Sequence, residues 1–318
     1  MEPTDRIARG DRIARGLMGG GAARVVAVVA THLVQEAVRR HGATGPAAIA
    51  MGRAAVAGLL LATLAKDDER VTLQILGQGP LGAVTVDASG AGTARVFVTK
   101  PQVAASVSMG PSDGRPSIGD AVGRHGLVNV IRDVGDGQDF NGQTPIVDGE
   151  IDTDVESYLC RSEQIDSALV CEAQLDEAGA IRVAAGVLVQ ALPHSEGSPA
   201  VAAARARFRQ GVLARLVAEA TTADPTLTPA DLLAVALAEE VASLKRLDER
   251  PVAFECPCSR ERAASTLALL GEDDLLTLIR EEGEAEVTCE FCRAQYLFND
   301  AALEEIRHRI RRSAPPPS

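Results

Sequence analysis

Four of the six cysteines in this 318-residue sequence stand in two close pairs near its C-terminal end. Cys256 and Cys258 are separated by one proline in "FECPCSRERA", and Cys289 and Cys292 form a C-x-x-C pair in "VTCEFCRAQY". Zinc takes thiolates at about 2.3 Å in a tetrahedron, which puts its sulfur ligands roughly 3.8 Å apart. A C-x-x-C pair meets this requirement in a tight turn. The pattern therefore indicates a zinc site with these four ligands.

The C-x-C pair meets the same requirement only where the backbone turns, because residues i and i+2 of an extended strand lie about 7 Å apart. Pro257 fixes φ at the turning position. Between the pairs the sequence predicts two short helices and a strand, with breaks at Gly271 and Gly283. A unit of about 50 residues has a marginal core, and a metal is a common remedy. Four isolated core cysteines, or two structural disulfides, are the alternatives.

A closed site of four cysteines has no open coordination position, so Lewis-acid catalysis is not expected. No two of the five histidines stand at ligand spacing, and we interpret them as surface or capping residues: His32, His41, His125, His194 and His308. Cys160 and Cys171 are single thiols, which are most simply buried small apolar residues.

The composition narrows the partners and the compartment. The core must be aliphatic, since 46% of residues are hydrophobic but only 3% are aromatic. The net charge of −12 argues against nucleic acid as the main partner, and residues 254–300 hold eight glutamates and three aspartates against four arginines. The most apolar stretch, 47–65, contains Arg53 and predicts a buried helix, not a membrane span. With no secretory signal visible, we expect a cytoplasmic protein, in which paired cysteines more often bind metal or sense redox state.

An α+β domain is predicted for residues 1–193. The hexapeptide DRIARG occurs twice at its start, in residues 5–10 and 11–16, and we interpret this stretch as a frayed terminus or as a start placed too early. Hydrophobic patterns and turn residues then predict strands at 23–30, 71–76, 82–87, 93–98, 127–132, 169–174 and 180–192, and helices at 31–42, 47–64 and near 154–160.

Residues 194–250 are predicted to be a helical linker. Segments 201–220 and 229–247 are rich in Ala, Leu and Val at helical spacing, and Thr228 and Pro229 supply an N-cap and a first-turn proline. Two such helices cannot bury a core alone, so they must pack on something else. Residues 251–300 would form the zinc-binding unit, and the basic, proline-rich residues 301–318 a disordered tail.

Most of the chain resembles the 33 kDa chaperonin family, the redox-regulated heat-shock holdases of the bacterial cytosol. The resemblance rests on "CPCSRER…LLG…VTCEFC" and on "THLVQEAVRRHG", "ERVTLQILGQGPLG", "GLVNVIRDVGDGQDFNGQTPIVDGEI", "SYLCRSEQIDSALV" and "VAAGVLVQALP". RSEQ at residues 161–164 replaces the family's usual QSEQ, and Ala185 stands where a second glycine is common.

The resemblance implies a chaperone and no enzymatic reaction. Cys256, Cys258, Cys289 and Cys292 would bind Zn²⁺ in the reduced, inactive state. On oxidation they would release it and form the disulfides Cys256–Cys258 and Cys289–Cys292. The linker would unfold, and the oxidised homodimer would hold unfolding client proteins.

Physical reasoning is compatible with such a switch. Structural zinc contributes on the order of 10–16 kcal/mol in small modules, and whole domains are stable by only about 5–15 kcal/mol. Metal loss should therefore unfold the C-terminal unit and expose apolar linker residues: Leu213, Leu216, Val217, Leu232, Leu233, Val235, Leu237 and Leu244. Two alternatives remain: a zinc-ribbon-type structural or interaction module without switching, and a thiol–disulfide oxidoreductase.

Overall fold

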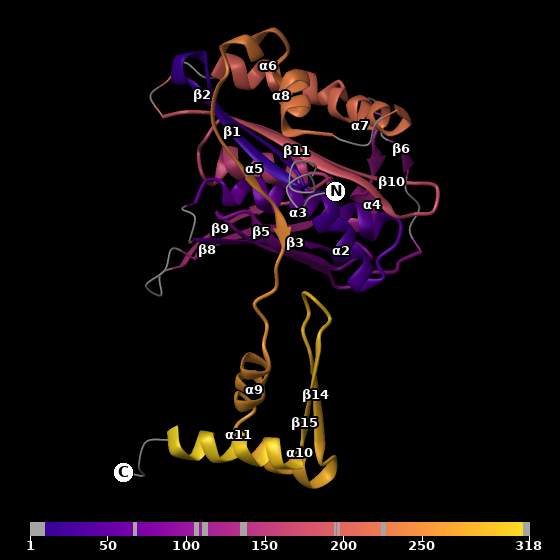
Figure 1. Cartoon of the computed structure of the whole chain (residues 1–318), viewed down its shortest axis with the longest axis vertical. Helices are drawn as coiled ribbons and strands as arrows, with labels where there is room; N and C mark the ends of the chain where they lie inside the picture. The colour runs from indigo at the N-terminus through magenta and orange to yellow at the C-terminus, as the bar shows by residue number, and fades with distance from the viewer. Residues whose placement is uncertain are drawn as a thin grey trace, which may run out of the picture. The chain divides into compact units, whose positions relative to one another are not determined.

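The computed structural model describes residues 10–65, 69–104, 108–109, 114–133, 139–193, 195, 198–223 and 227–313. Internal contacts divide the chain into one unit that ends at Glu255 and a second that begins at Cys256. Helices and sheets are mixed along the chain, which confirms the predicted α+β class (Figure 1).

Two sheets build the first unit. The five-stranded sheet is antiparallel, in the order β10 (Ser167–Leu175), β11 (Ile181–Ala191), β2 (Ala23–Val29), β1 (Arg12–Met18) and β12 (Lys245–Pro251). The six-stranded sheet has the order β13 (Ala253–Phe254), β5 (Thr93–Val98), β4 (Ala83–Ser89), β3 (Arg70–Gly77), β8 (Gly126–Asp133) and β9 (Asp139–Pro145). A short pair, β6 (Ser108–Met109) and β7 (Pro116–Ser117), stands apart. Each strand predicted from the sequence is present.

Helix α3 (Pro46–Ala62) contacts both sheets, and each of its residues is buried (Figure 1). Small residues permit this close approach. A Cβ at Gly52 would come 2.6 Å from the Ala173 Cβ of β10, and one at Gly58 would come 2.5 Å from Val86 of β4. Arg53 is fully buried, and its guanidinium donates to the Glu150 carboxylate and the Pro116 carbonyl, both at 2.7 Å. The predicted buried helix is thus confirmed.

Three further helices of the first unit contact α3: α2 (Thr31–His41), α4 (Gly119–Val122) and α5 (Asp152–Arg161). Within the described ranges, no helix is both long enough and apolar enough to cross a membrane.

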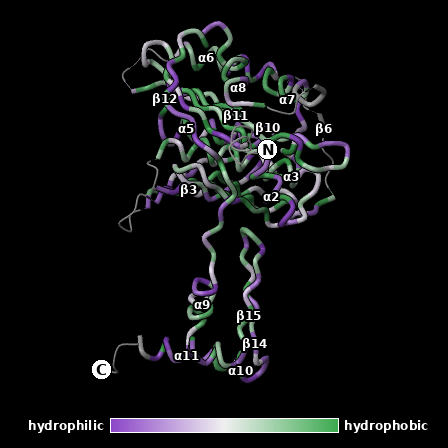
Figure 2. Tube along the Cα trace, in the orientation of Figure 1, coloured by the Kyte–Doolittle hydropathy of each residue, from purple (hydrophilic) through white to green (hydrophobic). Residues whose placement is uncertain are grey.

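The linker helices pack on the other face of the five-stranded sheet. These are α6 (Ser198–Arg209), α7 (Val212–Ala223) and α8 (Pro229–Leu237), followed by the 3₁₀ helix η2 (Ala238–Ser243) (Figure 1). Phe208, Leu213 and Leu233 join Val25 and Val187 of the sheet in one buried apolar cluster. The sheet is therefore covered on both faces, which explains why β2 and β11 are mostly apolar along their length (Figure 2). The prediction that these helices need a partner surface is confirmed.

Two segments differ from the sequence predictions. The second DRIARG copy is not frayed: it forms most of β1, which a 3₁₀ turn η1 (Gly19–Gly21) joins to β2, and Asp11 accepts bonds from the backbone N–H groups of His32 and Leu33. The predicted helix 229–247 ends at Leu237, where Ala238 takes a φ of 49°, and β12 follows. Its side chains pair with β1, with Arg15 bound to Asp248 at 2.7 Å and Arg12 bound to Glu249. The first DRIARG copy lies outside the described residues except for Gly10.

The second unit contains α9 (Arg260–Ala268), α10 (Glu272–Glu281), the hairpin β14 (Glu284–Thr288) and β15 (Gln295–Asn299), and α11 (Asp300–Ser313). The predicted disordered tail is thus wrong for residues 301–313. Leu303, Ile306 and Ile310 recur at helical spacing and pack into the small core of this unit, while the arginines between them gave the sequence its basic appearance. Asn299 caps the helix by accepting from the Ala302 N–H at 3.1 Å.

Replacing Leu303 by alanine should loosen the second unit. The side chain is fully buried, so its loss should cost about 2–5 kcal/mol. Hydrogen exchange on the full-length protein should then be at least tenfold faster in residues 300–313. Glu305→Ala, an exposed position on the same helix, is the matched control and should leave the rates unchanged. Equal exchange in all three proteins would mean that the helix contributes nothing to this core.

Candidate metal centre

The first cysteine pair lies in the loop between β13 and α9. Cys256 follows β13 by two residues, and Cys258 directly precedes Ser259, the N-cap of α9. The Ser259 hydroxyl accepts from the Arg262 N–H at 3.2 Å, so the helix begins at a fixed position behind the pair. Local capping therefore anchors the C-x-C turn.

The second pair occupies the turn of the β14–β15 hairpin, whose register places Thr288 opposite Gln295. Inside the turn the Cys289 N–H donates to the Ala294 carbonyl at 2.9 Å, and the Arg293 N–H donates to the Cys289 carbonyl at 2.8 Å. Arg293 adopts a left-handed φ of 60°, which closes the turn within the few residues available.

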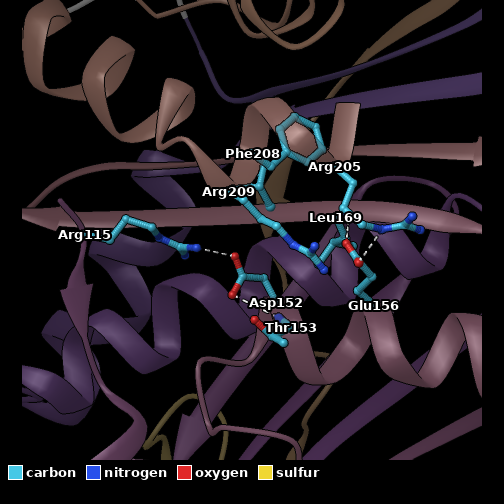
Figure 3. Close-up of a pocket in the computed structure, with 9 residues that line it drawn as sticks. Arg115, Asp152, Thr153, Glu156, Leu169, Arg205, Phe208 and Arg209 are labelled. Atoms are coloured by element: carbon cyan, nitrogen blue, oxygen red, sulfur yellow. Dashed lines mark hydrogen bonds and ion pairs between the residues drawn. The ribbon is translucent and has the colours of Figure 1, made fainter. Parts of the chain in front are cut away.

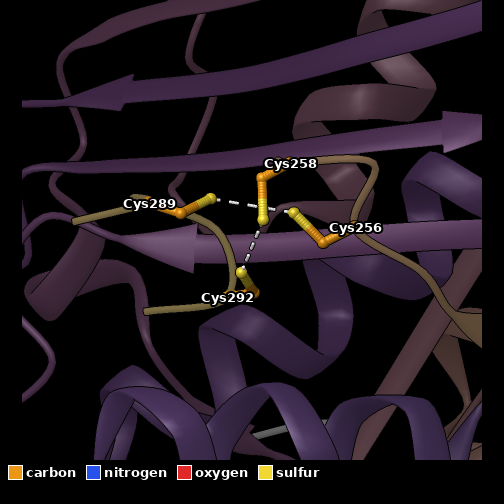
Figure 4. A group of neighbouring side chains, drawn as sticks. All are labelled: Cys256, Cys258, Cys289 and Cys292. Atoms are coloured by element: carbon orange, nitrogen blue, oxygen red, sulfur yellow. Dashed lines mark hydrogen bonds between the residues drawn. The ribbon is translucent and has the colours of Figure 1, made fainter. Parts of the chain in front are cut away.

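The two pairs come together. All four sulfur atoms lie within 4.8 Å of one another (Figure 4). Two of the contacts join one pair to the other: 3.7 Å between the Sγ atoms of Cys256 and Cys289, and 3.2 Å between those of Cys258 and Cys292. Residues more than 30 positions apart in sequence are thus gathered around one point, as their spacing predicted.

The surroundings of the sulfurs act in opposite directions on their protons. Burial raises the pKa of Cys292 to about 12 and also raises the pKa of Cys289. Backbone N–H groups lower both, those of Phe291 and Cys292 at Cys289 and that of Ala294 at Cys292. Without a cation these thiols stay protonated at neutral pH. The N–H groups that point at them are suited to thiolates.

Tyr296 is a fifth member of the site that the sequence reasoning missed. Its hydroxyl donates to the Cys258 Sγ at 3.1 Å, and that bond raises the pKa of Tyr296 to about 12, so the hydroxyl keeps its proton. The available signal was its place in the strand directly after the second pair, as one of only two tyrosines in the chain. Outer hydrogen bonds of this kind orient metal ligands and tune their basicity.

The donor set fits a soft, tetrahedral metal ion. Thiolates select zinc, copper(I) or iron–sulfur clusters over magnesium and calcium. The sulfur contacts of 3.7 and 3.2 Å lie at and below the roughly 3.8 Å expected around zinc, so the four sulfurs are close enough to share one ion. Among the described residues, these four cysteines form the group of cysteines, histidines and carboxylates able to hold a metal. The cluster can therefore bind a metal ion through sulfur alone.

The other candidate residues lie elsewhere. Cys171 is fully buried in β10, as predicted, and burial raises its pKa. Cys160 is only half-buried, at the end of α5, where its Sγ contacts the Ser167 carbonyl oxygen at 3.8 Å. His32 sits beside Asp11 at 3.1 Å, and His125 and His308 are exposed. His194 lies outside the described residues.

Comparison with known proteins places these features in a family. The family model described as Hsp33 protein matches residues 11–299. A 33 kDa chaperonin of Listeria welshimeri is 34% identical over 93% of this chain and 98% of its own length. That of Bacillus subtilis is 32% identical over 95% and 100% of the two chains.

A solved structure agrees with the sequence matches. The crystal structure of the 33 kDa chaperonin (heat shock protein 33 homolog) of Thermotoga maritima superposes with a TM-score of 0.81 at 29% identity, over 94% of this chain and 98% of that one. The family match covers both units, and the four cysteines lie inside it. The chain belongs to the Hsp33 family.

Proposed function

We propose that this protein is a redox-regulated holdase chaperone of the bacterial cytoplasm, which binds unfolding proteins and prevents their aggregation during oxidative stress. The reduced protein holds Zn²⁺ through Cys256, Cys258, Cys289 and Cys292 and is inactive. Oxidation releases the metal, forms the disulfides Cys256–Cys258 and Cys289–Cys292, and yields an active homodimer with no enzymatic reaction. The relatives' names, 33 kDa chaperonin and heat shock protein 33 homolog, support a chaperone. The observation that carries the switch is the approach of four sulfurs within 4.8 Å.

The metal would compensate for a small core. The buried apolar residues of the second unit are few: Ala263, Ala264, Leu267, Leu275, Phe298, Leu303 and Ile306. When bound, zinc supplies a divalent charge that keeps four sulfurs deprotonated and holds both turns together. The four cysteines and the metal would thus stabilise the second unit, which apolar packing alone stabilises poorly.

Oxidation would remove the ligands' charge. Each disulfide forms when two thiolates lose two electrons to an oxidant such as hydrogen peroxide, which takes up two protons and becomes two molecules of water. A disulfide sulfur carries no negative charge and is a poor zinc ligand. The 3.7 and 3.2 Å sulfur contacts join cysteines of different pairs, whereas the proposed disulfides form within each pair.

Strand β12 would transmit the unfolding of the zinc unit to the linker helices. It follows the linker helices in sequence and is separated from Cys256 by only a few residues, including β13, which pairs with β5 over just two residues. The sequence of β12, KRLDERP, has one large apolar side chain, Leu247, which is 54% exposed. Ion pairs at the surface add little stability, so we expect β12 to detach readily once its continuation unfolds.

The linker helices would then release a large apolar surface. Val201, Phe208 and Leu232 of the helices face Ala27 and Val189 of the sheet, and all five are buried. From the sequence we expected the zinc unit to support part of the linker helices. Their buried apolar face packs instead on the five-stranded sheet. Release therefore uncovers both the helices and the sheet. Such a surface recognises exposed apolar chain and not a sequence, as a holdase requires.

The two alternatives fit the geometry less well. Thiol–disulfide oxidoreductases use a C-x-x-C at a helix N-terminus, whereas Cys289 and Cys292 lie in a hairpin turn. A purely structural zinc module would not require the segments that precede it in the chain, namely the charged edge strand β12 and the linker helices that cover an apolar sheet. The experiments below separate it from the switch.

Zinc release, linker exchange and chaperone activity should appear together. We expect peroxide treatment of the zinc-loaded protein to release metal to a colorimetric chelator, to speed hydrogen exchange in residues 198–243, and to suppress aggregation of an unfolding client. The reason is that metal loss unfolds the second unit and frees β12. Reduced protein and protein reduced again after oxidation are the controls. Activity with zinc retained, or zinc loss with unchanged exchange in residues 198–243, would contradict the mechanism.

Replacing Tyr296 by phenylalanine should weaken the site without removing a ligand. The change deletes the hydrogen bond to Cys258 and keeps the ring, so zinc affinity should fall about tenfold to a hundredfold, as for other outer-shell partners. Competition with a zinc chelator measures the affinity. Tyr158→Phe, in the first unit, is the matched control and should leave it unchanged. An unaltered affinity in the Tyr296 variant would show that the hydroxyl plays no part at the site.

Arg205 attaches the first linker helix to the rest of its unit. Its guanidinium binds the Glu156 carboxylate of α5 at 2.9 Å (Figure 3). It also binds the Asp166 carboxylate and the Ser167 carbonyl, both at 2.7 Å. These groups are mostly buried, so the contact resists screening by solvent better than the ion pairs of β12 do. It fixes α6 across the edge of the apolar interface.

Arg205→Met should therefore lower the barrier to activation. Loss of charged hydrogen bonds costs about 1–3 kcal/mol, so exchange of residues 198–209 in the reduced protein should be at least fivefold faster, and the oxidised protein should become active at a lower temperature. Arg209→Met, on the same helix and exposed, removes the same charge and is the control. If both variants match the unmodified protein, Arg205 does not hold the linker.

A further inference from the structure

A cavity of ≈ 240 Å³ lies in the first unit beside β1, β2 and β12, and none of the six cysteines lines it. Its lining includes Leu17, Val26, Leu192 and Leu247, together with the guanidinium-bearing side chains of Arg15 and Arg24. A cavity with apolar walls and a few cationic groups is suited to bind a small amphipathic anion.

Arg24 is the distinctive member of this lining. Its Nε and Nη2 atoms donate to the Gln190 side-chain oxygen at 2.8 and 2.5 Å. Gln190 is fully buried and its own amide nitrogen donates to the Ser167 hydroxyl at 2.8 Å, so the amide oxygen is fixed toward Arg24. The partner that holds Arg24 is therefore a neutral amide.

Neighbouring arginines each have a carboxylate, but Arg24 has none in the part of the chain that the structure describes. Arg15 binds Asp248 at 2.7 Å and Arg132 binds Glu163 at 3.0 Å. Burial lowers the pKa of Arg24 to about 10, and the positive charges of Arg132 and Arg15 act in the same direction. A buried cation is stabilised by an anion brought to it. The cavity thus carries positive charge that a ligand could neutralise.

Strand β12 contributes one apolar side chain, that of Leu247, to the wall of the cavity. The pairing of β1 with β12 shifts between Arg15, opposite Asp248, and Gly16, opposite Arg246, which leaves Leu247 as the extra residue of a bulge. Bulges redirect side chains, and this one leaves Leu247 lining the cavity while 54% exposed. A bound apolar chain would cover it.

We propose that this cavity binds a medium-chain carboxylate, with the carboxylate at the guanidinium of Arg24 and the hydrocarbon chain against Leu17, Leu192 and Leu247. A guanidinium has five N–H donors, and the bonds to Gln190 leave enough of them for a carboxylate. A cavity of about 150 Å³ holds a benzene ring, so the present volume suits a ligand of roughly ten non-hydrogen atoms. Octanoate is of that size. The inference does not depend on the redox switch.

The test is titration calorimetry of octanoate into the full-length reduced protein. We expect octanoate to bind at least tenfold more tightly than 1-octanol, which has the same chain without the charge, and than inorganic phosphate, which has charge without the chain. Hydrogen exchange of residues 245–251 should slow on binding, because the ligand covers the wall that β12 supplies. Equal affinities for octanoate and octanol, or for octanoate and phosphate, would overturn the proposal, as would unchanged exchange in β12.

Variants locate the binding to this cavity. Arg24→Gln should weaken octanoate at least tenfold while leaving octanol unaffected. Leu247→Asp changes an exposed residue, so the protein should stay folded, and the added negative charge should also weaken octanoate at least tenfold. Leu127→Asp, at a comparably exposed leucine on β8, is the matched control and should bind as the unmodified protein does. Unchanged octanoate binding in the Leu247 variant would place the ligand elsewhere and refute the assignment.

Discussion

The convergence of four sulfur atoms from distant parts of the chain is the constraint on which the second unit depends. Four thiolates within 4.8 Å would repel one another, and burial, together with the neighbouring sulfurs, raises the pKa of Cys292 to about 12. A divalent cation reverses this preference, because it favours every sulfur in its charged form at once. The backbone N–H groups of the hairpin turn and the Tyr296 hydroxyl are already arranged for that charged form. The local structure around the sulfurs is thus suited to a bound cation.

The chain segment that connects the two units is important for the same reason. The second unit's small core makes it dependent on the sulfurs, and β12 is a charged strand whose pairing relies on backbone bonds and ion pairs such as Arg15–Asp248. The linker helices are different, because a continuous apolar cluster holds them to the sheet and Arg205 fixes their first member. A graded response would then begin at the oxidised cysteines, continue with β12 and end with the helices.

Much of this could be predicted from the sequence, and the failures have physical causes. The spacing of four cysteines located the metal centre because tetrahedral coordination restricts spacing severely. The β2 and β11 runs were recognisable, but whether helices cover both faces of their sheet cannot be read from one strand. The strand at 12–18 was hidden by a repeated charged hexapeptide, and β12 by the apolar helix before it, since both take their shape from pairing with each other. Tyr296 was missed because its role depends on where one hydroxyl points.

Detachment of β12 would create an edge, and the chain is adapted to that consequence. A strand that loses its neighbour exposes unpaired backbone groups that invite aggregation, a hazard for a protein meant to prevent it. Arg15 lies along that edge of β1, so the side chain that binds Asp248 in the folded state loses this carboxylate when β12 leaves. Edge charge of one sign discourages a second copy from pairing there. The apolar face of the sheet that the linker helices uncover, with Val25 and Ala27, would then be free to bind clients. The charged edge beside it would discourage pairing with a second copy of the chain.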